Sequence, residues 1–377
     1  MITNLRIKNF RAFKDFELKN LNQITLIGGR NNSGKSAILE SIFLNFGIQN
    51  SNVFGIPNPN VFYILAALRN EFPSAVATPV KIWTPLFHNY NESNEIDIQL
   101  TRDGNCQSFL SIKKVPDNTF ASSAPPNALS TLLNQGISPN HLGEYFYALD
   151  VSYSLNDFKI TGRYQYRKDG IQFILGAETK ENNTSPLKVF LYTSKNTQSN
   201  AIVAEWFSQL NLLGKKSKII EMLRIFDPDI EDIITVAENG TSSLYVQFQT
   251  GSIMPLSMLG DGINKAFQIL LIILTTPNGI VLIDEIENGF HYSIYTQIIT
   301  MFYQAAIKYN TQLIITTHNL DILKTFSSVM CSNSVADNEG LNRLTYERID
   351  FSQNQRRAFS FTGEELLRAL DAKLEVR

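Results

Sequence analysis

The chain has 377 residues, of which 44% are hydrophobic and 18% are charged, and its formal net charge is −2. This length favours two or three domain-sized parts of an ordinary globular protein. The balanced charge argues against a large uniform nucleic-acid-binding surface, although Lys215–Lys218 could form a local basic patch. Two cysteines do not support a disulfide framework or a zinc site. The start of the chain lacks the apolar run of a signal peptide, and no apolar run is long enough to cross a membrane, so we expect a cytoplasmic protein without membrane contact.

The N-terminal part predicts strands, then a glycine-rich loop and a helix. Ile2–Leu18 alternates apolar and polar residues, which favours one or two half-buried strands. Gln23–Gly29 predicts a short buried strand that runs into glycines. Ala37–Phe46 carries apolar residues at helical spacing, and Gly47 is a plausible end. This order of strand, glycine loop and helix is the context that a phosphate-binding loop needs.

The middle of the chain gives weaker signals. Alternation predicts strands at Ile96–Thr101 and Ser108–Lys113 and a hairpin over Lys159–Phe173, whereas Asn200–Phe226 has helical spacing. We therefore predict three parts: residues 1–125 with the first portion of a lobe that contains the glycine-rich loop, 126–240 as an intervening and mainly helical lobe, and 241–377 as the remainder of the first lobe with a C-terminal helix.

The last third of the chain alternates helices and strands. The expected elements are helix Asn264–Leu274, strand Gly279–Ile283, helix Ser293–Lys308, strand Gln312–Thr316, and a helix that begins after His318. Alternation of this kind implies a parallel sheet with crossover helices. The predicted fold class is therefore α/β.

Gly29–Ser36 fits the Walker A rule of a glycine, four variable residues, and then Gly-Lys-Ser. Its backbone N–H groups would form a nest for the β- and γ-phosphates of ATP. Lys35 would add a positive charge there, and the Ser36 hydroxyl would bind Mg²⁺. The alternative is a chance glycine turn, which the flanking strand and helix disfavour. The predicted nucleotide-binding residues of the loop are Gly29, Asn31, Asn32, Ser33, Gly34, Lys35 and Ser36.

Two further strand ends carry polar side chains. The apolar strand Gly279–Ile283 is followed by Asp284, which would hold Mg²⁺, and by Glu285, which would act as the general base on the attacking water. Adjacent acids are usually surface charge, but their place after this strand favours the Walker B pattern. His318 follows Gln312–Thr316 and could bond the γ-phosphate or the attacking water. The alternative for His318 is a structural, helix-capping role.

A second glycine-containing loop, Leu256–Gly262, precedes a predicted helix and forms a second candidate anion nest. One chain needs only one nest for its ATP, so the second suggests that a partner subunit's nucleotide is bound in trans. A flexible connection with a serine N-cap is the alternative.

Taken in order, these motifs and Asn9-Phe10-Arg11 resemble the ABC-type ATPases of the SMC, RecF and OLD group. More narrowly, they are similar to the compact AAA-type OLD-like ATPases of bacterial anti-phage systems such as PARIS and Septu. The resemblance implies a P-loop NTPase head whose central sheet is flanked by helices, with a helical lobe inserted between Walker A and the signature motif. It also implies a head-to-tail homodimer around ATP and Mg²⁺, with a higher oligomer as the alternative. The residues that it assigns are Ser257, Gly260 and Gly262 as contacts in trans, Asn288 and Gly289 as the D-loop, His318 as the switch, and Arg11 near the nucleotide.

The sequence departs from this family pattern at Asn32, which replaces a glycine of many SMC-like Walker A loops as the Walker A rule permits, and in two further places. Leu256–Gly262 replaces the usual Leu-Ser-Gly-Gly-Gln, so the residue that meets the γ-phosphate is not fixed. No glutamine marks a Q-loop, and Phe87–Asn89 is only a weak substitute. An ATP-driving subunit of a transporter is disfavoured on both grounds.

The function expected from the resemblance is an ATP-gated switch in phage defence that controls a separately encoded effector, either a Toprim-like nuclease or another toxin. Only 59 residues (377 − 318) follow His318, which is short for a second catalytic domain. The rival is a RecF- or SMC-like ATPase of DNA repair or maintenance, which would bind DNA. The apolar stripe in Glu364–Leu374 either packs on the chain's own core or helps to dock a partner.

Overall fold

A computed structural model describes residues 1–47, 60–68, 82–117, 147–167, 170–178, 187–193, 200–238, 240–332, 339–352 and 355–376. The chain forms two compact units, each built from separate segments of the sequence. Unit 1 comprises Met1–Leu21, Arg30–Leu187 and Ile349–Phe359, and unit 2 comprises Asn22–Gly29, Lys188–Arg348 and Ser360–Arg377. The predicted boundaries at 125 and 240 coincide with neither unit. Within the described ranges, no helix is long and apolar enough to cross a membrane.

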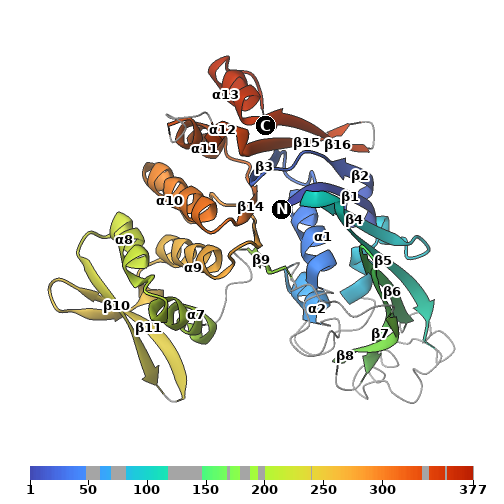
Figure 1. The fold of residues 1–377 in the computed structure, drawn as a ribbon, viewed down its shortest axis with the longest axis horizontal. Helices are drawn as coiled ribbons and strands as arrows, with labels where there is room; N and C mark the ends of the chain where they lie inside the picture. Colours follow the sequence, from blue (N-terminus) through green and yellow to red (C-terminus); the bar gives the residue numbers. More distant parts are fainter. Residues whose placement is uncertain are drawn as a thin grey trace, which may run out of the picture. The chain divides into compact units, whose positions relative to one another are not determined.

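Unit 1 contains an antiparallel sheet of seven strands in the order β2-β1-β4-β5-β6-β7-β8 (Figure 1). Helix α1 (Lys35–Gly47) packs on β1, β4 and β5 and against α2 (Asn60–Ala67). The bounds of the strands are β1 (Ile2–Phe10), β2 (Phe13–Leu18), β4 (Ile96–Arg102), β5 (Cys106–Pro116), β6 (Tyr147–Leu155), β7 (Phe158–Arg167) and β8 (Gly170–Glu178).

The predicted strands of unit 1 are present in the structure, and the interval 126–240, predicted as a mainly helical lobe, contains strands as well as helices among its described residues. Strands β6, β7 and β8 occupy Tyr147–Glu178, because buried and less buried residues alternate along β6 as an antiparallel sheet requires. The helices described in that interval are α7 (Asn200–Leu212) and α8 (Lys216–Phe226). They belong to unit 2, where α7 packs on β11 and α8 on β10 of a three-stranded sheet. Its strands are β10 (Ile230–Glu238), β11 (Thr241–Phe248) and β12 (Ile253–Pro255).

The second sheet of unit 2 has the order β16-β15-β3-β14-β13-β9. Strands β3, β14, β13 and β9 are parallel neighbours, which confirms the predicted parallel sheet. Every residue of β3, β13 and β14 is buried, as expected for strands covered on both faces. The bounds are β3 (Ile24–Gly29), β9 (Val189–Tyr192), β13 (Ile280–Ile283), β14 (Gln312–Thr316), β15 (Leu344–Ser352) and β16 (Gln355–Thr362).

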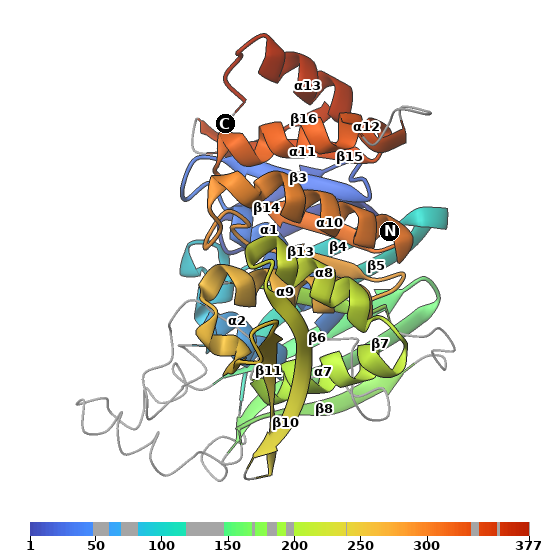
Figure 2. The ribbon, with the colours of Figure 1, turned by 90° about the vertical axis from the view of Figure 1, so that its left-hand side faces the viewer.

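Three helices lie side by side along the parallel strands of this sheet, as Figures 1 and 2 show. They are α9 (Asp261–Thr275), α10 (Tyr295–Lys308) and α11 (Leu320–Ser332), and short helical turns η5 (Leu256–Met258) and η6 (Tyr292–Ile294) precede the first two. Apolar residues of these helices pack into the hydrophobic core of unit 2. The parallel sheet and its helices therefore place the ends of β13 and β14 at one edge.

The C-terminal elements were only partly predicted. Strands β15 and β16 are consecutive neighbours and form a C-terminal hairpin that the sequence did not suggest. Helix α13 (Gly363–Asp371) contacts α11 after the short α12 (Glu339–Asn342). Leu366 is fully buried, with Leu367 and Leu370 packed against the core, so the interpretation of this stripe as own-core packing is confirmed for these residues. Leu374 is exposed.

Candidate active site

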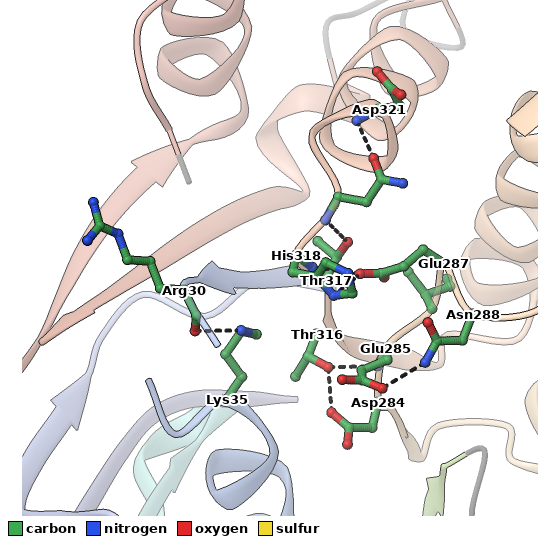
Figure 3. A network of polar contacts seen from close by, with 12 residues as sticks. Arg30, Lys35, Asp284, Glu285, Glu287, Asn288, Thr316, Thr317, His318 and Asp321 are labelled. Carbon is green, nitrogen blue, oxygen red and sulfur yellow. Dashed lines mark hydrogen bonds and ion pairs between the residues drawn. The ribbon is translucent and has the colours of Figure 1, made fainter. Parts of the chain in front are cut away.

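The Walker A loop follows β3 and leads into α1. Gly29, Asn32 and Gly34 have positive φ angles of 132°, 63° and 104°, a backbone region that glycine tolerates best. Arg30 provides a carbonyl oxygen at the centre of the turn. It accepts bonds from the backbone N–H of Ser33 at 3.2 Å and from Lys35 Nζ at 3.0 Å, the second of which is drawn in Figure 3. The loop is therefore tightly curved, as a phosphate nest requires.

Position 34 requires glycine for two reasons: its backbone conformation and the lack of space for a side chain. A Cβ atom at this position would lie 2.7 Å from Cζ of Phe13, which is buried on β2. The hydroxyl of Ser33 is also buried and has no hydrogen-bond partner among the described residues. The loop thus has a curved backbone, a glycine packed closely against Phe13, and a helix that starts at Lys35. These features fit the binding of a polyphosphate.

The Walker B acids lie where two parallel strands end. Ile283 of β13 pairs with Ile315 of β14, so Asp284 and Thr316 follow at the same edge of the sheet. The Thr316 hydroxyl donates to Asp284 Oδ1 at 2.6 Å and accepts from the backbone N–H of Glu285 at 2.8 Å (Figure 3). One threonine therefore orients both consecutive acids.

The turn after Asp284 holds Glu285 in an unusual backbone conformation, with φ of 50°. Such a conformation costs about 1–3 kcal/mol for a residue other than glycine, so other contacts must stabilise it. The ammonium of Lys265, on α9, donates to the carbonyl oxygens of Glu285, Ile286 and Asn288 at 2.8, 3.0 and 2.9 Å. The amide of Asn288 donates to Glu285 Oε2 at 2.7 Å. Backbone and carboxylate of Glu285 are thus both fixed.

Lys265 is the most perturbed cation of this cluster. Burial lowers its pKa to about 8, and the nearby carboxylates of Glu287, Glu285 and Asp284 partly oppose that shift. Its ammonium also lies 5.1 Å from the ring centre of Phe290. Because the side chain is only 5% exposed, its three carbonyl partners replace water as acceptors.

His318 is held by a buried carboxylate. Glu287 Oε1 lies 2.7 Å from His318 Nδ1 and also accepts the backbone N–H of His318 at 2.7 Å (Figure 3). A carboxylate can only accept, so Nδ1 carries a proton, and in a neutral ring Nε2 is the acceptor. The second Glu287 oxygen has no hydrogen-bond partner among the described residues. Glu287 therefore selects both the orientation and the tautomer of His318.

The signature loop uses its two glycines differently. Gly260 has φ of 99°, and nothing lies within 4 Å of where its Cβ would be, so a ligand can approach it. A Cβ at Gly262 would lie 2.4 Å from the carbonyl oxygen of Gly289, so Gly262 allows α9 to pack against the turn after Walker B. Asn264 donates to the Gly260 carbonyl oxygen at 2.9 Å. The geometry thus gives Gly262 a packing contact within its own chain.

Arg11 lies in the interior of unit 1. Its Nε is 2.8 Å from Glu40 Oε2 with both side chains buried, and the guanidinium also donates to the carbonyl oxygens of Pro85 and Leu65. These contacts connect the β1–β2 turn to α1. His88, in the weak Q-loop candidate, places Nδ1 2.9 Å from the Arg11 carbonyl oxygen. A role for Arg11 at the nucleotide stays a prediction.

The structure brings together Asp284, Glu285 and His318 in unit 2 as predicted, and adds three residues that the motifs did not mark: Thr316 as a bridge, Glu287 and Lys265. Glu287 had a weak signal, since it is an acid two positions after Glu285 in the segment that follows the apolar strand. Lys265 had none, because its partners are backbone oxygens.

A phosphate loop together with an Asp–Glu pair at a strand end defines a P-loop nucleoside triphosphatase. Residues 24–324, more than three quarters of the sequence, match the model of the family described as "AAA domain, putative AbiEii toxin, Type IV TA system", so the chain belongs to that family.

Individual relatives agree with this class. The chain is 25% identical over 350 residues to an "ATP/GTP phosphatase" of Helicobacter pylori, covering 88% of each chain. It is 23% identical over 385 residues to the "Retron Vc95 probable ATPase" of Vibrio cholerae, covering 87% of this chain and 72% of the relative. A solved Smc head domain derived from Pyrococcus furiosus covers 99% of both chains at 11% identity, with a TM-score of 0.48, a level from which we draw nothing further.

Proposed function

We propose that this P-loop nucleoside triphosphatase is an ABC-type, dimeric ATP switch, and that it is the ATPase subunit of a bacterial anti-phage defence system. The observation that carries the proposal is the cluster at the ends of β13 and β14. There, Thr316, Asn288 and Glu287 orient Asp284, Glu285 and His318 (Figure 3). A strained residue with a fixed carboxylate is typical of a catalytic group.

ATP would bind with its phosphates on the backbone N–H groups of the Walker A loop and on Lys35. Mg²⁺ would be held by the Ser36 hydroxyl and the Asp284 carboxylate, since hard oxygen ligands of this kind suit that ion. Bound Mg²⁺ would neutralise charge that develops on the phosphates during hydrolysis.

Glu285 is the proposed general base, and its carboxylate is kept in place by Asn288. His318 would present Nε2 to the attacking water, from which the neutral ring can accept a hydrogen bond, because Nδ1 is bonded to Glu287. Only the protonated ring could donate from Nε2 to the γ-phosphate. Neither group needs to reorganise during the reaction. A preorganised site lowers the activation free energy mainly by avoiding that reorganisation.

The proposed dimer is head-to-tail, with the signature loop of one subunit on the ATP of the other. Gly260 supports this because its surroundings are open and α9 begins directly after it. We assign the trans contact to Ser257 and Gly260, while Gly262 is explained by its packing on Gly289.

Two descriptions support the defence role. The description of the matching family mentions a type IV toxin–antitoxin system, and one relative is described as the probable ATPase of a retron. A switch controls an effector only if the effector binds its two states with different affinity. We therefore propose a separately encoded nuclease or toxin that distinguishes the ATP-closed dimer from the open form.

The test of catalysis uses two variants. Lys35→Ala removes the charge on the phosphates, so the folded protein should hydrolyse no ATP. Glu285→Gln should still bind ATP while hydrolysis falls by roughly 10²–10⁴, the range for removal of a general base. Normal turnover by Lys35→Ala would contradict the Walker A assignment, and loss of ATP binding in Glu285→Gln would assign that residue to binding instead.

The dimer is tested with Ser257→Arg. This variant should bind ATP but neither close nor hydrolyse, whereas Glu285→Gln with ATP and Mg²⁺ should accumulate dimers in light scattering. Mixing Ser257→Arg with Lys35→Ala should restore part of the activity, because one composite site is intact. Full activity of Ser257→Arg alone would exclude this loop.

The defence role is tested with the product of the neighbouring gene. Its capture should differ between Glu285→Gln with ATP and Lys35→Ala, and the ATPase alone should leave plasmid DNA and RNA uncut. Equal capture by both variants would exclude gating. Tight, salt-dependent DNA binding without such a partner would favour the rival DNA-maintenance role.

A further inference from the structure

Arg356, on strand β16 of the C-terminal hairpin, contacts the Walker A loop from outside every motif. Its Nε donates to the carbonyl oxygen of Ser33 at 3.0 Å, and its terminal nitrogens donate to those of Ala12 at 2.6 Å and Asn32 at 3.4 Å. All of these residues belong to unit 1. One guanidinium thus joins the β1–β2 turn, the phosphate loop and the hairpin.

Two aromatic rings hold the guanidinium in place. Its central carbon lies 4.8 Å from the ring centre of Phe351 and 5.9 Å from that of Phe13, the residue that also contacts Gly34. Guanidinium groups stack well on aromatic faces and lose little entropy when they bond several oxygens at once. Burial lowers the pKa of Arg356 from its ordinary value, which is consistent with a group partly withdrawn from water.

The carbonyl group of Ser33 belongs to the same peptide unit as the N–H group of Gly34, whereas the N–H of the Asn32–Ser33 peptide unit donates to the Arg30 carbonyl oxygen within the turn. In a Walker A nest the N–H ends face the phosphates, so the carbonyl ends point away from them. A cation bonded to the carbonyl end polarises the peptide and strengthens its N–H as a donor. The same charge adds positive potential on the side where phosphate binds.

We propose that Arg356 is a positioning residue for nucleotide binding: it fixes the Asn32–Gly34 backbone from behind and polarises it toward the phosphates. The inference rests on the proposed binding of ATP at the Walker A loop. It makes the C-terminal hairpin part of the nucleotide site, although its residues contact no reacting atom.

The chain offers a matched control in the next residue. Arg357 is exposed on the same strand, and no hydrogen bond or ion pair of its side chain is described. Arg356→Met and Arg357→Met therefore make the same change in charge, side-chain size and strand position. They differ in the contact with the loop.

The measurement is ATP affinity by calorimetric titration, together with KM, kcat and melting temperature, for the full-length chain. Arg356→Met should raise Kd and KM about tenfold, the equivalent of roughly one hydrogen bond from a charged donor, with kcat within about twofold. Arg356→Lys should lie between wild type and Arg356→Met, because it keeps the charge but loses the planar fork. Arg357→Met should match the wild type in all four quantities.

Equal KM values for Arg356→Met and Arg357→Met would overturn the inference, as would a shift in melting temperature without one in affinity. If Arg356→Met does not fold, Arg356→Lys decides the question, since a wild-type Kd for that variant contradicts the proposal. Failure of the proposed function looks different. In that case the wild-type protein would bind no ATP, or Lys35→Ala would bind ATP as tightly as the wild type.

Discussion

The Walker A loop and the cluster around Glu285 are assigned to one proposed reaction, but they are stabilised in different ways. In the loop the backbone itself is the proposed binding surface, and glycines, positive φ angles and the Arg356 contacts fix the main chain. In the cluster the side chains are proposed to do the chemistry, and further side chains fix them: Thr316, Asn288 and Glu287 each bond a proposed catalytic or metal-binding residue. Changes around the loop should therefore alter nucleotide affinity, and changes around the cluster should alter kcat.

The largest effect on kcat among the supporting residues is expected for Glu287→Gln. The amide can still accept at one atom but can present N–H₂ to His318 Nδ1, so the ring loses its tautomer and orientation. We expect kcat to fall roughly 10- to 100-fold, as for other groups that orient a functional histidine, with KM unchanged. Steady-state kinetics measure this.

The control for Glu287→Gln is Glu364→Gln, because Glu364 is an exposed acid on α13 that pairs with Arg368. It should leave kcat unaltered. A rise in KM without a change in kcat for Glu287→Gln would contradict the comparison, since it would make this carboxylate a support for binding.

A smaller fall in kcat is expected for Lys265→Met. The substitution keeps the length of the side chain but leaves the carbonyl oxygens of Glu285, Ile286 and Asn288 without their donor. The turn should relax from its strained conformation, and kcat should fall about tenfold while ATP affinity stays the same. Kinetics and ATP titration on the same preparation separate the two quantities.

Lys265 also gives a pH signature. Its folded pKa of about 8 lies below its ordinary value of 10.5, so between these pH values the folded state binds fewer protons than the unfolded state. Its contribution to the free energy of unfolding must then rise with pH in that window. The melting temperature of the wild type relative to Lys265→Met should increase from pH 8 toward pH 10, and a decrease would be inconsistent with a buried cation.

Asn288→Ala tests the weakest restraint in the cluster. One hydrogen bond to Glu285 Oε2 is lost, while the Lys265 contacts with the backbone persist. A net contribution of about 0.5–1.5 kcal/mol per hydrogen bond corresponds to a fall in kcat of roughly 2- to 10-fold. Asn211→Ala, at an exposed position on α7, is the control. No change in kcat would mean that the carboxylate finds its position without this amide.

The sequence could predict what the linear motifs and apolar periodicity encode. These include the phosphate loop, the two acids after β13, and a parallel sheet that contains β13 and β14 with helices between its strands. It could not predict contacts between a side chain and a distant carbonyl oxygen, because every residue offers the same carbonyl. Arg356 and Ser33 are 323 positions apart, and nothing in the residue type of Ser33 marks it as an acceptor. Strand β6 was not predicted, because its short alternating run lies in a part of the chain where the resemblance implied helices, whereas the hairpin of β7 and β8 was expected from Lys159–Phe173.

The smallest effect on catalysis, and a test of the hairpin itself, is expected from Glu347→Gln. Glu347 lies on β15, is 1% exposed and accepts a bond from the Ser360 hydroxyl at 2.7 Å. Burial raises its pKa to about 7 from 4.5, so the folded state binds more protons than the unfolded state between these pH values. Stability linked to this group is therefore present below pH 4.5 and is lost as pH rises through 7. A glutamine keeps the acceptor for Ser360 and carries no charge, so at pH 8 the variant should be more stable than wild type by about 1–3 kcal/mol, and the difference should disappear near pH 4.5. Denaturant unfolding at both pH values measures this.

Because the hairpin acts on the Walker A loop through Arg356, the KM for ATP should stay at the wild-type value. A changed KM with Arg356 intact would mean that hairpin stability itself, and not the guanidinium contact, governs nucleotide affinity.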